Sequence, residues 1–319
     1  MELGMKHRLI FGSLFIAMLL GLIYADEHFA TAEFFTRAPE ALSALGVLSL
    51  GGLIVTLILL ALVILATREM TLLLRGAGHE PLGGWPIVVN VALLLIPFVA
   101  ANGYPADPAA LHARDWMLTT AAVVIAFVGT AIGVAARRTT DHAMAAIGAT
   151  LLGILYVGLL APFIIRIRVF GPPGASWLLL YYIGVVKFCD MGAYFTGRAI
   201  GRTKLIEWLS PKKTIEGLAG GVTASVVVAV VIPMIVRSLA SPESPVQTLF
   251  PTPFRAAIFG VAMALVGHAG DLLESLFKRD AKAKDSAAAI PAFGGVLDII
   301  DSPLLTAPLA YWILLSWPK

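Results

Sequence analysis

The sequence predicts an all-α polytopic membrane protein with about nine transmembrane helices. Three observations lead to this fold class. First, 59% of the 319 residues are hydrophobic and only 13% are charged, whereas an ordinary soluble domain has roughly 25% charged residues. Second, several apolar runs are long enough to cross the roughly 30 Å hydrocarbon core of a bilayer as helices. Third, Lys and Arg residues gather in alternate connections, as they do in chains that cross a membrane repeatedly.

Hydropathy places nine candidate spans along the chain. They cover residues 9–25, 43–66, 85–102, 116–135, 143–165, 176–196, 217–236, 254–270 and 302–317. The first span follows Lys6 and Arg8, and the acidic residues after it favour a retained helix over a cleaved signal peptide. We divide the chain into residues 1–140, an N-terminal transmembrane part of about four spans, and residues 141–319, a C-terminal part of about five spans.

The distribution of positive charge predicts the orientation. With the N-terminus inside, the inner connections hold fifteen Lys and Arg residues and the outer connections hold seven, including Arg166 and Arg168. Positive residues gather on the cytoplasmic side, so a cytoplasmic N-terminus is expected. Two inner connections, residues 198–216 and 271–301, combine cations, carboxylates, Gly and Pro. The single cysteine, Cys189, excludes an internal disulfide and a cysteine metal cluster.

The segment GHAGDLLESLFKRDAKAKD, residues 267–285, joins the eighth span directly to a charged stretch. If the helix continues, a face about 80° wide presents Asp271, Ser275, Lys278, Lys282 and Asp285. The alanine-rich residues that follow favour a helix up to Pro291. Ion pairs on a solvated helix end would explain an ordinary charge run. Carboxylates beside the hydrocarbon are costly, however, and usually mark a functional site.

The next segment, AFGGVLDIIDSP at residues 292–303, has the components of a metal–phosphate site. Gly294 and Gly295 permit backbone amides to approach an anion closely. Asp298 and Asp301 share a face if the segment is helical. Hard carboxylates bind Mg²⁺, and amides and cations bind phosphate oxygens. A DxxD pair alone is more often a helix cap, so the prediction rests on the joint occurrence.

The end of the sixth span and the connection after it carry a second polar cluster. Lys187 and Asp190 lie on one helix face, where a purely structural ion pair is an equal explanation. The following SPKKTIEG contributes Ser210, Lys213 and Thr214, which suit phosphate recognition. Attraction to anionic lipid head groups would also explain its lysines.

Together these segments resemble the phosphatidate cytidylyltransferase (CDP-diacylglycerol synthase) family. The family pattern S-x-x-K-R-x4-K-D-x5-P-x-H-G-G-x-x-D-R-x-D is matched by Ser275, Lys278, Arg279, Lys284, Asp285, Pro291, Gly294, Gly295, Asp298 and Asp301. The upstream patterns D-x-G-A-Y-F-x-G-R and S-P-x-K-T-x-E-G are matched by Asp190, Gly192, Ala193, Tyr194, Phe195, Gly197, Arg198, Ser210, Pro211, Lys213, Thr214, Glu216 and Gly217. Phe293 and Ile299 depart from the histidine and arginine of the family, and the detailed match covers residues 185–302.

The resemblance implies transfer of CMP from CTP to phosphatidate, giving CDP-diacylglycerol and pyrophosphate for phospholipid synthesis. It implies that residues 141–319 catalyse the reaction on the cytoplasmic side of a cell membrane. In cells with two membranes this is the inner membrane. Mg²⁺ is expected at Asp271 and Asp298, with Asp301 and Asp285 as ligands or neighbours, and a second cation such as K⁺ is compatible. The expected catalytic residues are Asp271, Lys278, Arg279, Lys284, Asp285, Asp298 and Asp301, and the expected substrate contacts are Asp190, Ser210, Lys213, Thr214, Ser275, Gly294 and Gly295. A homodimer is compatible with the resemblance, and no nucleic acid partner is expected.

Other functions remain open at this point. A CTP-dependent lipid kinase, a cytidylyltransferase for another lipid phosphate and an inactive homologue all fit, the last because of Phe293 and Ile299. A transporter that uses Lys187, Asp190 and Asp271 as an ion relay would spread its charges across several spans near the bilayer midplane. The polar residues gather at one face instead. A phosphate nucleophile is already ionised at neutral pH, so no Ser/His/Asp arrangement is required.

Overall fold

The computed structural model describes residues 20–28, 50–103, 107–239, 246, 249–250, 252–283, 286 and 295–316. Its elements are α4 (Leu53–Gly76), α5 (Trp85–Asn102), α6 (Pro108–Ala135), α7 (Ala143–Gly153), the π-helix η1 (Ile154–Leu159), α8 (Pro162–Val169), α9 (Ala175–Ile200), β1 (Lys204–Ile206), β2 (Ser210–Thr214), α10 (Ile215–Leu239), α12 (Pro253–Asp280) and α13 (Val296–Ser316). Within these residues, eight segments are long and apolar enough to cross a membrane, with α7, η1 and α8 forming one of them. The predicted all-α integral membrane fold is confirmed. Residues 20–28 are helical, and the rest of the predicted first span lies outside the described residues.

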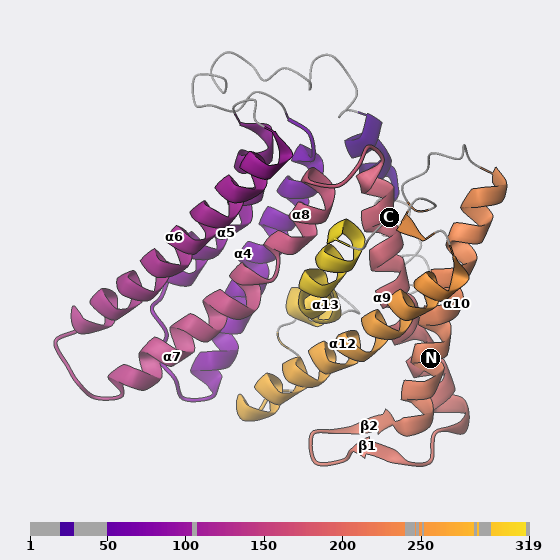
Figure 1. Ribbon diagram of the computed structural model, residues 1–319. Coiled ribbons are helices and arrows are strands. Elements are labelled where there is room, and N and C mark those ends of the chain that lie inside the picture. Colours follow the sequence, from indigo (N-terminus) through magenta and orange to yellow (C-terminus); the bar gives the residue numbers. More distant parts are fainter. Residues whose placement is uncertain are drawn as a thin grey trace.

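The helices form two groups that meet along α13 (Figure 1). Helices α4 to α8 lie on one side, and α9, α10 and α12 lie on the other, with α13 in contact with α4, α8, α9 and α12. One continuous core of buried side chains runs through both groups, from Leu59 of α4 through Ile165 of α8 to Leu304 of α13. The last helix therefore joins the two groups.

Several helices begin or end where hydropathy did not place them, and in α4 and α13 the difference concerns carboxylates. Helix α4 continues to Gly76, ten residues past the predicted end at residue 66, and includes Arg68 and Glu69. Glu69 is tolerated because its buried carboxylate accepts several hydrogen bonds. Helix α13 begins at Val296, six residues before the predicted start at residue 302. Both changes bring carboxylates into helices.

The prediction that the eighth helix continues to Pro291 is wrong, because α12 ends at Asp280. Lys282 has a φ of 54°, in the left-handed region. The amide of Lys282 donates to Arg279 O and the amide of Ala283 donates to Lys278 O, at 3.0 and 2.8 Å. This pair of bonds is a Schellman termination. It removes Lys282 from the predicted polar face, and Asp285 lies outside the described residues.

Arg166 and Arg168 belong to α8 and not to an outer connection as predicted. The Nε atom of Arg166 lies 2.7 Å from Oδ2 of Asp115, with both side chains fully buried. Arg168 forms a buried ion pair with Asp26 of the helical residues 20–28. Because each arginine has a carboxylate partner, the cost of burying its charge is offset, and the helix extends past both.

The connection between α9 and α10 forms an antiparallel hairpin of β1 and β2. It lies at one end of these two helices (Figure 1). The carboxylate of Glu216, at the start of α10, accepts hydrogen bonds from the amides of Arg202 and Thr203 at 3.1 and 3.2 Å. Thr214 Oγ1 accepts a hydrogen bond from Gly217 N at 3.1 Å and so caps α10. These bonds fix both ends of the hairpin against the start of α10.

Candidate functional site

A pocket of about 410 Å³ opens where α9, α10, α12 and the hairpin meet. Its lining includes five residues that the sequence predicted as site residues, Asp190, Ser210, Lys213, Thr214 and Asp271. They come from three separate parts of the chain: α9, β2 and α12. The fold thus brings the two predicted polar segments to one place.

Small residues permit this close arrangement. A Cβ atom on Gly192 of α9 would lie 2.8 Å from the carbonyl oxygen of Gly220 in α10. A Cβ atom on Gly201, after α9, would lie 2.7 Å from Thr214 Oγ1 in β2. Glycine at these positions lets α9 approach both α10 and the hairpin strand that lines the pocket.

Two carboxylates that line the pocket, Asp190 and Asp271, are already paired with lysines. Lys213 Nζ lies 2.8 Å from Oδ2 of Asp271, and Lys187 Nζ lies 3.2 Å from Oδ2 of Asp190. A cation bound to Asp271 would compete with Lys213 for its carboxylate and release the ammonium group. An anionic ligand could then take Lys213 as its partner, so cation and anion binding would favour each other here.

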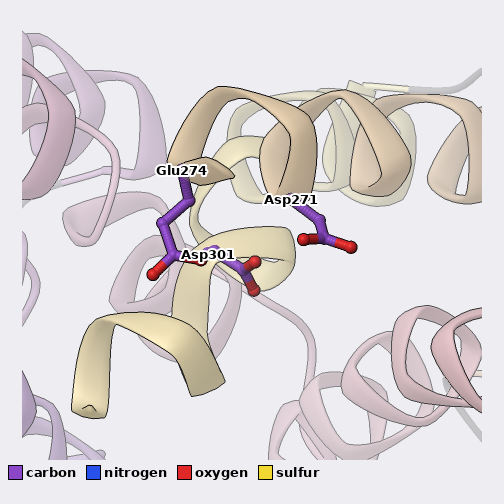
Figure 2. Close-up of side chains that lie close together, drawn as sticks. All are labelled: Asp271, Glu274 and Asp301. Carbon is purple, nitrogen blue, oxygen red and sulfur yellow. The ribbon is translucent and has the colours of Figure 1, made fainter. Parts of the chain in front are cut away.

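Three carboxylates converge beside the pocket (Figure 2). Asp271, Glu274 and Asp301 each offer an oxygen atom, and these three atoms lie within 4.8 Å of one another. Asp271 and Glu274 are one turn apart on α12, and Asp301 reaches them from α13. Glu274 and Asp301 are buried, and Glu274 Oε1 has no hydrogen-bond partner among the described residues. A hard divalent cation prefers such oxygen ligands, so the cluster fits Mg²⁺.

The carboxylate of Asp298 lies beside this cluster and is contacted by several hydrogen-bond donors. Lys278 Nζ lies 2.6 Å from its Oδ1 atom, and the Gly295 amide donates to its Oδ2 atom at 2.8 Å. The same Nζ atom lies 2.8 Å from Oε2 of Glu274. Lys278 therefore connects Asp298 to the three-carboxylate cluster. That Asp298 itself ligates a metal stays a prediction.

The remaining predicted residues are divided between the site and its surroundings. Arg279 Nε donates to the carbonyl of Leu209 at 3.3 Å and so ties the end of α12 to the hairpin. Ser275 follows Asp271 by one turn on α12. Three predicted residues, Lys284, Asp285 and Gly294, lie outside the described residues.

Sequence reasoning missed Glu274, Glu69 and Tyr156. Glu274 had a usable signal, since it is a carboxylate three residues after Asp271 in the same segment. Glu69 is an acidic residue within an apolar run, which marks a site in a membrane helix. Tyr156 gave no such signal: its hydroxyl is buried without a partner among the described residues, within electrostatic reach of Asp301, Glu274 and Asp271.

Comparison with known proteins places this geometry in context. A model of the cytidylyltransferase family matches residues 39–317. A phosphatidate cytidylyltransferase of Chlamydia pneumoniae is 29% identical over 260 residues, which cover 78% of each chain. A phosphatidate cytidylyltransferase of Synechocystis sp. is 29% identical over 296 residues, 85% of this chain and 92% of the relative. Phosphatidate cytidylyltransferase 5, chloroplastic, of Arabidopsis thaliana is 30% identical over 297 residues, 85% of this chain and 68% of the relative.

Proposed function

The chain belongs to the cytidylyltransferase family, and on that premise we propose that it transfers the CMP group of CTP to phosphatidate, releasing pyrophosphate and forming CDP-diacylglycerol. One observation carries the proposal. The pocket lined by Lys213, Ser210 and Thr214 shares Asp271 with the three-carboxylate cluster. Groups suited to phosphate and groups suited to a divalent cation therefore meet at a single residue.

The reaction needs charge neutralisation more than proton transfer. An oxygen of the phosphatidate phosphate forms a bond to the α-phosphorus of CTP, and the bond from that phosphorus to the bridging oxygen of the β-phosphate breaks. Pyrophosphate leaves with the electron pair. Since both reactants are anions, positioned cations lower the barrier by stabilising the charge that is redistributed.

The chain's own cations have distinct places in this scheme. Lys213, whose side chain is 17% exposed, faces the pocket and would hold a phosphate group there. Lys278 lies between Glu274 and Asp298 and would keep these carboxylates in place. Asp271, Glu274 and Asp301 would hold Mg²⁺, which supplies Lewis-acid stabilisation of phosphate oxygens when bound.

The location of the site agrees with the two substrates. The pocket lies at the ends of α9 and α10, beside the hairpin, which carries four charged residues, Lys204, Glu207, Lys212 and Lys213. The excess of Lys and Arg in the predicted inner connections supports a position of the site on the cytoplasmic side. In a cell with two membranes this would be the cytoplasmic side of the inner membrane. CTP would enter from water, and phosphatidate would enter from the lipid leaflet.

The test uses purified protein in phosphatidate-containing micelles with Mg²⁺ and CTP labelled at either the α- or the γ-phosphate. We expect the α-label in a lipid product and the γ-label in pyrophosphate, in equal amounts. Asp271→Asn should lower the formation of both products by more than about 100-fold, while the matched control Glu207→Gln, at an exposed hairpin residue, should retain it. A γ-labelled lipid with released CDP would identify a lipid kinase, and no product from folded wild type would identify an inactive homologue.

A further inference from the structure

Glu69 connects the N-terminal helices to the carboxylate-bearing helix α13. It lies on α4 and is only 5% exposed. Its Oε1 atom accepts a hydrogen bond from the Val296 amide at 2.9 Å, and its Oε2 atom accepts one from the Leu297 amide at 2.8 Å. These amides belong to the first turn of α13, where backbone donors lack partners within the helix. Glu69 thus caps α13 from a helix far earlier in the chain, since it precedes Val296 by 227 residues.

The capping carboxylate is also joined to Asp298. Ser286 Oγ lies 3.1 Å from Oε2 of Glu69 and 2.9 Å from Oδ2 of Asp298. A hydroxyl has one proton to donate, so the two carboxylates share it. The Ser286 amide donates a second bond to Asp298 at 3.2 Å. Asp298 in turn contacts Lys278, the cation bound to Glu274.

The capped turn carries the residues of the site. Asp298 follows Leu297 directly, and Asp301 lies one turn later. Any rotation or shift of the first turn of α13 would therefore move Asp301 relative to Asp271 and Glu274, which lie on α12. A carboxylate at a helix N-terminus is also favoured by the helix dipole, which helps to hold the charge of Glu69 in a buried place.

We propose that Glu69 is a positioning residue for the candidate metal site: it fixes the start of α13 so that Asp301 meets Asp271 and Glu274. The role of Glu69 in catalysis rests on the proposed function, whereas its effect on cation binding does not. A residue that merely stabilised the fold would lower the unfolding temperature and leave the affinity for Mg²⁺ unchanged.

The experiment compares Glu69→Gln with wild type in detergent by two measurements. Glutamine keeps the size of the side chain but presents an NH₂ group where an amide needs an acceptor. We expect the Mn²⁺ concentration that half-saturates the protein, measured by electron paramagnetic resonance, to rise about 10- to 100-fold, as is typical when residues that orient metal ligands are altered. The Mg²⁺ concentration for half-maximal formation of CDP-lipid should rise by a similar factor. Glu69→Asp, which keeps both acceptor oxygens, should recover part of each loss.

Asp26→Asn provides the matched control. Asp26 is also a buried carboxylate, and its Oδ1 atom accepts hydrogen bonds from the amides of Ile54 and Val55 at 3.1 and 3.3 Å, at the start of α4. It caps a helix as Glu69 does, it also pairs with Arg168, and among the described residues its partners do not include the carboxylate cluster. We expect its variant to unfold at a lower temperature and to bind Mn²⁺ as wild type does.

Equal Mn²⁺ affinity in wild type and Glu69→Gln would overturn the proposal, and so would an equal loss of affinity in Glu69→Gln and Asp26→Asn. If Glu69→Gln does not fold, Ser286→Ala takes its place, because it removes the shared hydroxyl and should raise the half-saturating Mn²⁺ concentration in the same direction. A wild type that forms no CDP-lipid would reject the proposed function, while the Mn²⁺ measurement would still decide the role of Glu69.

Discussion

Replacing Lys278 by Met tests whether the charges of the site stabilise one another. Lys278 Nζ lies 2.8 Å from Glu274 and 2.6 Å from Asp298, and its side chain is 14% exposed. The variant leaves two carboxylates without this cation. Asp298 retains donors from Ser286 and Gly295, so the larger loss should arise at Glu274, whose side chain is 1% exposed.

The magnitude follows from this geometry. Removing one partner of a buried ion pair costs about 3–5 kcal/mol, because the other charge stays buried. We take the lower end, about 3 kcal/mol, since Lys278 is not fully buried and Asp298 keeps other donors. For a chain of this size the melting temperature should fall by about 2 °C per kcal/mol, or about 6 °C in total.

The assay is thermal unfolding in detergent without substrate, on Lys278→Met and on the double variant Lys278→Met/Glu274→Gln. Because the second substitution removes the stranded charge, the double variant should melt at a higher temperature than the single one. Lys282→Met, at an exposed lysine after α12, serves as control and should change stability by less than about 0.5 kcal/mol. A double variant less stable than Lys278→Met would refute the reasoning.

Three further predictions concern separate parts of the molecule. Asp271→Asn should lower the rate of CDP-lipid formation by more than about 100-fold at saturating CTP, since loss of a ligand should exceed the effect of losing a surrounding residue; a residual rate above about one hundredth of wild type would contradict its assignment. Arg166→Leu should destabilise the protein by about 3–5 kcal/mol in thermal unfolding by stranding Asp115, with no change in the Mg²⁺ requirement; a changed requirement would show that this pair acts on the site. Gly192→Ala should cost about 1–3 kcal/mol by overpacking against α10, whereas Gly184→Ala, where an added Cβ meets nothing within 4 Å, should melt as wild type does; equal melting of the two would reject the close approach.

The membrane spans could be predicted because hydropathy depends on the composition of about 20 consecutive residues. The ends of the helices depend on individual hydrogen bonds and ion pairs, which composition does not reveal. The alanine-rich residues after α12 favour a helix, and Lys282 carries no mark of the left-handed conformation that ends it. Arg166 reads as a loop residue because its partner Asp115 is 51 positions away. A single sequence does not show that such residues meet.

The site could be predicted at the level of its segments and less well at the level of individual contacts. Asp271 and Asp301 were expected at a metal site, and they do converge. The expected partner Asp298 instead contacts Lys278, and Glu274 completes the group. Which carboxylate of a helix reaches a neighbour depends on the depth and rotation of the two helices, and these are set by packing between α12 and α13. Glu69 acts through a contact between distant segments, which no local pattern contains.

The buried arginines of α8 have a consequence for how the protein is made. Synthesis proceeds from the N-terminus, so Asp26 and Asp115 leave the ribosome before Arg168 and Arg166, their respective partners. An unpaired arginine costs roughly 2.5–3.5 kcal/mol at the centre of a membrane helix, and the cost is smaller near the end of a span, where Arg166 and Arg168 lie. Both acidic partners therefore precede α8 in the chain, and they can pair with its arginines as that helix enters the membrane.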